Sequence, residues 1–283
     1  MSQYNPYGNQ QPGQGAMNYG GYGGGAAPPP SQRNGMSTGM IIAIILGILF
    51  LCFLLCGGVL AALLIPAISA ARAAASQVQD SNNMRMIGLA LHNYEATYKK
   101  LPTPYATNSN GEKVWSWRIA MLPFIEDGET FRKVDFQNMK AWDDPSNAAL
   151  QGPANPYFTS VRANLPPGSN GANIFLISNP KNKEGPNSAF VDGVYTKMSD
   201  CFDGTANTLV GVLLVKHSVP WASPETLSTE EAYRLIQNED ETFIGLFLDG
   251  SVRRLKTSID EQTFKAMVTC NGGEQLSPDM MEP

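Results

Sequence analysis

Apolar residues are concentrated in one long run, and the residues on either side of this run follow different patterns. Between Arg33 and Arg72 the sequence holds no Asp, Glu, Lys, Arg or His, and residues 40–71 are mostly Ile, Leu, Ala, Gly and Phe. A helix of about 20 such residues crosses a bilayer. The run therefore predicts a transmembrane helix over 40–71, with Pro66 so near its far end that a kink would fall close to the interface.

Two other interpretations of the apolar run are open. A cleaved signal peptide begins with a short basic segment and has an apolar core of about 7 to 15 residues, whereas 39 residues precede this longer run. A buried core helix would show a polar face, and this run has none. Both alternatives fit less well than a retained membrane span.

The pattern beyond the span stays helical but becomes amphipathic. Val78, Met84, Ile87, Leu91 and Tyr94 recur among polar residues at the intervals of an amphipathic helix. This stripe predicts that the helix continues over 72–102 and ends at the Leu-Pro pair there.

The two ends of the chain differ in composition. Residues 1–39 are rich in Gly, Gln, Asn, Tyr, Pro and Ser, with Arg33 as the only charge, and predict a disordered tail. After Ala71 there are 19 Lys and Arg against 25 Asp and Glu, a formal charge of −6. This acidic balance argues against nucleic acid as a partner. All four tryptophans lie here too, so 103–283 is expected to be one globular domain.

Strands are predicted late in this domain. Four segments rich in Val, Ile, Leu, Phe and Thr are bounded by turn residues: 173–178, 190–195, 208–215 and 242–248. Asp249-Gly250 after the last segment predicts a hairpin with a type I′ turn. Capping boxes at Ser228 with Glu231, and at Ser258 with Glu261, predict two flanking helices. The fold class is α+β, a long amino-terminal helix packed on a mainly antiparallel sheet.

A series of short motifs resembles one known family. The motifs run in order from Pro66-Ala67 through Ile87 to Tyr94 on the helix and on to the end of the domain. Those beyond the helix include Ser116, Trp117, Arg118, Trp142, Asn207, Trp221, Asp249, Gly250, Gly272, Gly273 and Glu274. Together they resemble the pilin-like planctomycete family called domain of unknown function 1559. The resemblance implies a cell-envelope protein with a pilin-like amino-terminal helix and an outward domain, without an established biochemical activity.

Two positions depart from the family pattern. Typical members begin with a Gly-Phe-Thr-Leu-x-Glu prepilin peptidase site before the apolar helix, where this chain has residues 37–42 without Phe or Glu. The resemblance then implies that tail and span are retained. Typical members also carry a His ten residues before the late Asp-Gly, where this chain has Glu239. A role that needs an imidazole there is not expected.

Candidate sites in the domain are sparse. Cys201 and Cys270 are a candidate disulfide in an oxidising compartment, with two free buried thiols as the alternative. Asp200, Asp203 and Asp249 are calcium candidates in oxygen-rich loops, although Asp-Gly is first of all a turn pattern. The two histidines, at 92 and 217, are too few for a His-rich metal site or a catalytic triad. Trp115, Trp117, Trp142 and Trp221 are candidates for stacking on sugars, and Trp is more often core.

Three functional hypotheses follow from these observations. The first is a non-enzymatic, single-pass envelope protein with its tail in the cytoplasm and its domain outside the membrane, whose partners are the lipid bilayer and itself or other pilin-like proteins. The second is a pseudopilin-like subunit of a secretion or pilus machine. The third is a carbohydrate- or calcium-binding envelope module. No cofactor is expected beyond calcium in the third case, and charge alone does not decide the orientation.

Overall fold

The computed structural model describes residues 35–183, 185 and 187–273. Most of the predicted tail, and Glu274 of the family motifs, lie outside the described residues. By its internal contacts the chain divides into two units, 1–61 and 62–283. The first unit contains, among its described residues, the beginning of the long helix α1, and the second contains the folded domain.

The long predicted helix is present as a single element, α1, Thr38–Tyr98. It begins where the Met40 amide hydrogen-bonds to the Ser37 side chain and carbonyl, and it continues past Pro66. It ends before Lys99, whose φ of 57° is left-handed and stops helical propagation. The predicted helix and its continuation are confirmed. The helix begins two residues before the predicted start at 40 and ends four residues before the predicted end at 102. Among the described residues α1 is the one helix long and apolar enough to cross a membrane.

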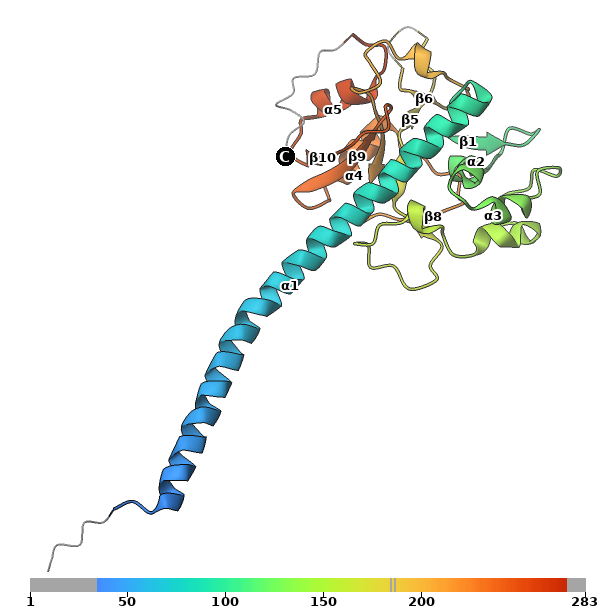
Figure 1. The fold of residues 1–283 in the computed structure, drawn as a ribbon. Coiled ribbons are helices and arrows are strands. Elements are labelled where there is room, and N and C mark those ends of the chain that lie inside the picture. Colours follow the sequence, from blue (N-terminus) through green and yellow to red (C-terminus); the bar gives the residue numbers. More distant parts are fainter. Residues whose placement is uncertain (1–34, 184, 186, 274–283) are drawn as a thin grey trace, which may run out of the picture. The chain divides into compact units, whose positions relative to one another are not determined.

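A four-stranded antiparallel sheet forms the centre of the domain, in the order β10-β9-β7-β4 (Figure 1). Its strands are β4 (Ile174–Leu176), β7 (Leu209–Leu213), β9 (Thr242–Phe247) and β10 (Val252–Lys256). All four lie in or directly after segments predicted from the sequence. The sheet is confirmed as antiparallel, and β10 is its edge strand on one side.

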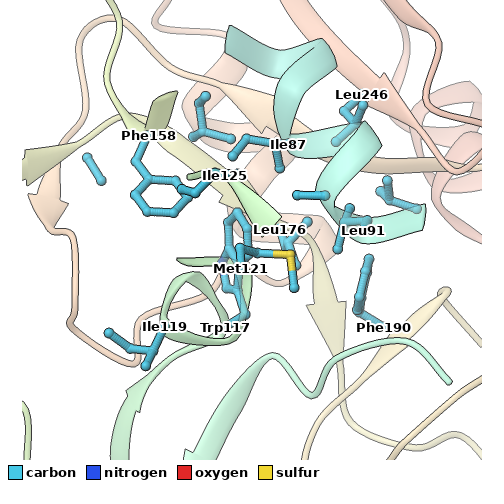
Figure 2. Close-up of a cluster of buried hydrophobic side chains, with 14 of the residues drawn as sticks. Ile87, Leu91, Trp117, Ile119, Met121, Ile125, Phe158, Leu176, Phe190 and Leu246 are labelled. Atoms are coloured by element: carbon cyan, nitrogen blue, oxygen red, sulfur yellow. The ribbon is translucent and has the colours of Figure 1, made fainter. Parts of the chain in front are cut away.

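Alternation along the central strands gives the sheet two apolar faces. Ile244 and Leu246 of β9 belong to the same buried cluster as Ile87 and Leu91 of α1, whereas the neighbouring Phe243 packs with the short carboxyl-terminal helices. Figure 2 shows Ile87 and Leu91 reaching from the helix toward Leu246 and Leu176. The domain is therefore layered, with α1 on one face of the sheet and helices on the other.

The helices on the second face are α4 (Thr229–Ile236) and α5 (Glu261–Val268). Ser228 caps α4 by accepting a hydrogen bond from the Glu231 amide at 3.1 Å, as predicted. The predicted cap of α5 at Ser258 is wrong, because Asp260 occupies that position and accepts from the Thr263 amide. A carboxylate one residue before the helix reaches its free amides, and Ser258 lies too early.

The Asp249-Gly250 hairpin is confirmed between β9 and β10, but its turn is not type I′. Among these two residues φ is positive at Gly250 alone, at 83°. The Gly250 amide donates to the Phe247 carbonyl, and the Phe247 amide to the Ser251 carbonyl, so the loop has three residues. This is a type I turn closed by a left-handed glycine, which a three-residue hairpin loop requires.

The remaining elements are short. Two-residue to four-residue strands form three small ladders: β1 (Tyr105–Thr107) with β2 (Lys113–Ser116), β3 (Gly171–Ala172) with β8 (Val219–Pro220), and, in parallel, β5 (Ser178–Asn179) with β6 (Phe190–Val191). The short helices are α2 (Trp117–Met121), α3 (Gly128–Arg132), η1 (Leu122–Phe124), η2 (Pro145–Gln151), η3 (Pro156–Phe158) and η4 (Met198–Asp200). Residues 117–124 thus form α2 followed directly by η1.

Candidate functional site

The carboxylate of Asp80 joins α1 to the loop that follows η3. The Asp80 side chain is 0 % exposed and accepts hydrogen bonds from the Ser160 hydroxyl at 2.8 Å, the Val161 amide at 2.8 Å and the Arg162 Nε at 2.6 Å. A buried charge is tolerated when it is paired and its oxygens are satisfied, as here. In the sequence Asp80 is one of the polar residues between the apolar positions of the stripe, and the pattern alone did not reveal this role.

Asn83 forms a second junction one turn further along α1. Its side-chain amide donates to the carbonyls of Pro156 and Thr159, both at 3.0 Å. Asp80, Met84, Ile87 and Leu91 share the buried face of α1. The detectable signal was a carboxylate on an otherwise apolar helical face, because such a charge needs a partner from elsewhere in the fold.

The Ser-Trp-Arg motif forms a buried centre around the Arg118 guanidinium. Arg118 donates through Nη1 to the Ser116 hydroxyl at 3.0 Å and to the Trp221 carbonyl at 3.3 Å, and through Nη2 to the Ile174 carbonyl. Burial lowers the pKa of Arg118 to about 9, against the opposing influence of Glu225. The side chain is therefore still charged at neutral pH. Three separate segments meet on one cation, which identifies this motif as a fold-organising element.

The tryptophans of the domain are core residues or pack on the core. Trp115, Trp117 and Trp221 are 5 %, 1 % and 2 % exposed, and Trp142 is half-buried against the same cluster. Phe158 stacks on Trp221 and meets Trp117 edge-on. Trp115, Trp117 and Trp221 are therefore core residues. The burial of Trp221 excludes the stacking of a sugar on this ring, which was part of the third hypothesis.

Later motifs meet around the loop of residues 203–208. The Asp203 carboxylate accepts from the amides of Gly272 and Gly273, both at 2.8 Å. The Asp249 amide donates to the Thr205 carbonyl, and Asn207 closes the loop by donating to the Asp203 carbonyl at 3.0 Å. Motifs far apart in sequence thus form one hydrogen-bonded junction.

The three calcium candidates serve as acceptors for backbone amides. Asp200 accepts from the Lys197 amide at 3.0 Å, Asp249 from the Ser251 amide at 2.8 Å, and Asp203 as described above. Among the described residues no three His, Cys, Asp or Glu side chains are grouped so that they could hold a metal ion. The turn interpretation accounts for the carboxylate contacts of Asp200 and Asp249, whereas the Asp203 carboxylate joins two distant segments.

Cys201 and Cys270 lie against each other as free, buried thiols. The hydrogen bond to Cys270, with burial as the second cause, raises the pKa of Cys201 well above its usual range. Both line a cavity of about 210 Å³ that Lys181, Tyr195 and Lys197 also border. The two candidate cysteines are thus neighbours in the fold, and whether they form a disulfide stays a prediction.

The histidines and Glu239 are placed at structural contacts. His92 faces the Asp249-Gly250 turn, where a Cβ on Gly250 would lie 3.5 Å from the imidazole, and its Nε2 has no hydrogen-bond partner among the described residues. The His217 ring packs on Phe175. Glu239, at the family's His position, accepts from the Val215 and Lys216 amides at 3.1 and 3.0 Å. The carboxylate therefore caps the end of β7.

Comparison with known proteins gives one family. A family model described as "Protein of unknown function (DUF1559)" matches residues 69–212, which is half of the chain. The matched range includes Asp80, Arg118 and the loop of residues 203–208, whereas the motifs at Trp221, Asp249 and Gly272 lie beyond it. No curated protein and no solved structure matches the chain.

Proposed function

This chain belongs to the DUF1559 family, and from that premise we propose that it is a non-enzymatic, membrane-anchored protein of the cell envelope. One observation carries the proposal: an apolar helix continues without a break into a folded domain, where Asp80 and Asn83 hold it. Residues 40–71 of α1 are exposed along their whole length. A hydrocarbon environment is the solvent in which such a surface is stable.

The role that fits this arrangement is structural. The motif residues Arg118, Asn207 and Trp221 join segments of the backbone, and each is occupied by contacts within the domain. We therefore propose a single-pass protein that presents its domain outside the membrane for adhesion or assembly, with its tail in the cytoplasm. The bilayer and other pilin-like proteins are the proposed partners.

Membrane fractionation tests the anchor and labelling tests the orientation. The full chain should stay in the pellet after alkaline carbonate extraction, because only an integral span resists that treatment. A membrane-impermeant maleimide applied to whole cells with a permeabilised outer layer should label Asn164→Cys and spare Ser31→Cys. The unaltered chain is the background control, since Cys201 and Cys270 are buried. Labelling of Ser31→Cys alone would overturn the orientation.

A pseudopilin-like subunit is the second candidate, favoured by the packing of one long helix on an antiparallel sheet. That function predicts cleavage before the apolar helix by a prepilin peptidase. Mass spectrometry of the mature protein distinguishes the two: an intact tail supports a retained anchor, and a new amino terminus near Met40 supports the pseudopilin.

A further inference from the structure

Two arginines meet in a groove between α1 and the edge strand β10. The groove has a volume of about 210 Å³. We call it the stalk groove, and its lining residues are Ala74, Gln77, Val78, Ser81, Arg85 and Arg254. Ala74, Val78, Ser81 and Arg85 share one face of α1, because they are spaced three or four residues apart, and Gln77 adjoins Val78 at the edge of that face. All six belong to the folded unit, so the groove is part of the domain itself.

The charge of the groove is positive, and among residues 35–183, 185 and 187–273 no carboxylate lines it. The nearest acidic residue in sequence, Asp80, is buried and engaged with Arg162. Among the described residues Arg85 bonds only to the Asn82 amide oxygen, at 3.0 Å, and the Arg254 guanidinium makes no hydrogen bond or ion pair. Two guanidiniums thus lie at one place without a carboxylate partner in the described part of the chain, and guanidiniums bind phosphate bidentately.

The groove also has an apolar end, and this end is the one nearer the membrane. Ala74 follows the end of the predicted span by three residues, about 5 Å along the helix. Val78 is 59 % exposed in the next turn, and Arg85 follows at the far end. Helical side chains point back toward the amino terminus, so Arg85 reaches toward the bilayer.

We propose that the stalk groove binds the phosphate headgroup of an anionic phospholipid, with Arg85 and Arg254 on the phosphate and the Ala74 and Val78 end facing the acyl chains. The Gln77 side chain supplies a further donor beside the arginines. The inference rests on the proposed membrane anchor and adds a lipid specificity to it. It makes the domain sensitive to the lipid composition of the leaflet it faces.

A lipid titration of the full chain tests the site. The chain is purified in a non-ionic detergent and titrated with phosphatidylglycerol or phosphatidylcholine of equal acyl chains, with bound lipid counted by native mass spectrometry. Phosphatidylglycerol should bind more tightly, because each arginine near an anionic headgroup contributes about fivefold in affinity. The double variant Arg85→Gln/Arg254→Gln should then lose roughly 25-fold for phosphatidylglycerol and much less for phosphatidylcholine, whose own choline cation offsets the charge of its phosphate.

The matched control removes two arginines elsewhere. Arg132→Gln/Arg234→Gln changes the net charge equally at exposed positions paired on α3 and α4, and it should leave lipid binding unchanged. Arg85→Lys/Arg254→Lys keeps the charge and should lose less affinity than the glutamine pair. An equal affinity of the unaltered chain for both lipids, or a double glutamine variant that binds within twofold of it, overturns the inference.

Two further experiments separate the alternatives. The first tests whether the bound phosphate belongs to a lipid or to a soluble compound, and the second tests the proposed anchor separately from the groove. If 10-fold excess inorganic phosphate or glycerophosphoglycerol displaces the lipid completely, the site holds a soluble phosphate and the lipid assignment is wrong. Carbonate extraction of membranes containing the double glutamine variant reports the span separately. Retention of the variant in the pellet with lost lipid selectivity supports the inference, whereas release of the unaltered chain overturns the proposed anchor instead.

Discussion

Asp80 and Gly88 show how single residues fasten α1 to the domain. The Asp80 carboxylate has no exposure and three donors, all from one loop that lies about 80 residues away in sequence. Gly88 lies two turns later, where a Cβ would come within 3.0 Å of Leu246 Cδ1 and 3.1 Å of the Gly250 Cα. One position therefore depends on charge and the other on the absence of a side chain.

Asp80→Asn should destabilise the folded domain by about 1.5–3 kcal/mol, because it weakens charge-assisted hydrogen bonds and leaves Arg162 without its partner. The thermal midpoint of the detergent-solubilised chain measures the change. Glu129→Gln is the control, since the Glu129–Arg132 pair is exposed on both sides and such pairs contribute at most about 1 kcal/mol. Equal effects of the two variants would contradict the assigned role of Asp80.

Gly88→Val should lower stability by about 1–3 kcal/mol, because the added side chain must displace the Gly250 backbone as well as the Leu246 methyl group. Leu89→Ala, on the exposed face of the same turn, is the control and should be close to neutral. The same thermal measurement compares them. A Gly88→Val chain with an unchanged midpoint would show that α1 does not contact the hairpin as closely as described.

At the scale of elements, the domain is organised by caps and turns that differ in how far they can be predicted. The α4 cap at Ser228 depends on residues three apart and was predicted correctly. The α5 cap was predicted two residues too early, and the hairpin turn was predicted at the right place with the wrong turn type. Both depend on where the strand before them ends, and that position is decided by pairing with other strands.

Serine-to-alanine substitutions distinguish the two caps. Ser228→Ala should cost about 1 kcal/mol, because the Glu231 amide loses its acceptor. Ser258→Ala should leave stability unchanged, although the sequence predicts a capping box at both sites. Urea unfolding followed by circular dichroism compares them. A loss at Ser258 equal to that at Ser228 would restore the predicted cap of α5.

The true cap of α5 also gives a pH dependence. Hydrogen bonds from the Thr263 side chain and amide lower the pKa of Asp260 below its ordinary 3.8. The folded state thus favours the carboxylate, so its contribution is complete above the ordinary pKa and is lost as the pH falls through the lowered value. Asp260→Ala should be less stable than the unaltered chain at pH 7, and this difference should shrink toward pH 3.

At the scale of the whole molecule, the compartment decides the state of Cys201 and Cys270. Their thiols are in contact but lie 69 residues apart in sequence, so a bond between them would close a long loop. In an oxidising envelope we predict a disulfide that stabilises the domain by about 4 kcal/mol. In a reducing compartment the raised pKa of Cys201 keeps it protonated and slow to react.

Alkylation of the protein in isolated membranes measures this state. Without reductant, two of the four thiols should be protected from maleimide, and reductant should release them. Cys201→Ser/Cys270→Ser gives the baseline, in which only Cys52 and Cys56 remain. Alkylation at four positions before reduction, in denaturant, would show that the pair is reduced in the cell.

The sequence by itself determined the elements whose cause is local. The apolar run, the amphipathic stripe up to Tyr94, the Asp-Gly hairpin and the strand segments each follow from residues that are neighbours in the chain. Each is present in the structure, although the segment 190–195 forms only the two-residue strand β6. The family membership belongs here too, because ordered motifs carry it. The predicted fold class, a long helix on a mainly antiparallel sheet, followed from these elements together.

Only the tertiary structure decided which distant residues meet. The donors for Asp80, the carbonyls around Arg118, the contact of Cys201 with Cys270 and the pairing of Arg85 with Arg254 in one groove all join separate segments. A single sequence shows that a charge lies on a buried face, but the partner that makes its burial tolerable is chosen by packing. The long apolar helix was therefore readable from the sequence, whereas the groove beside its continuation was not.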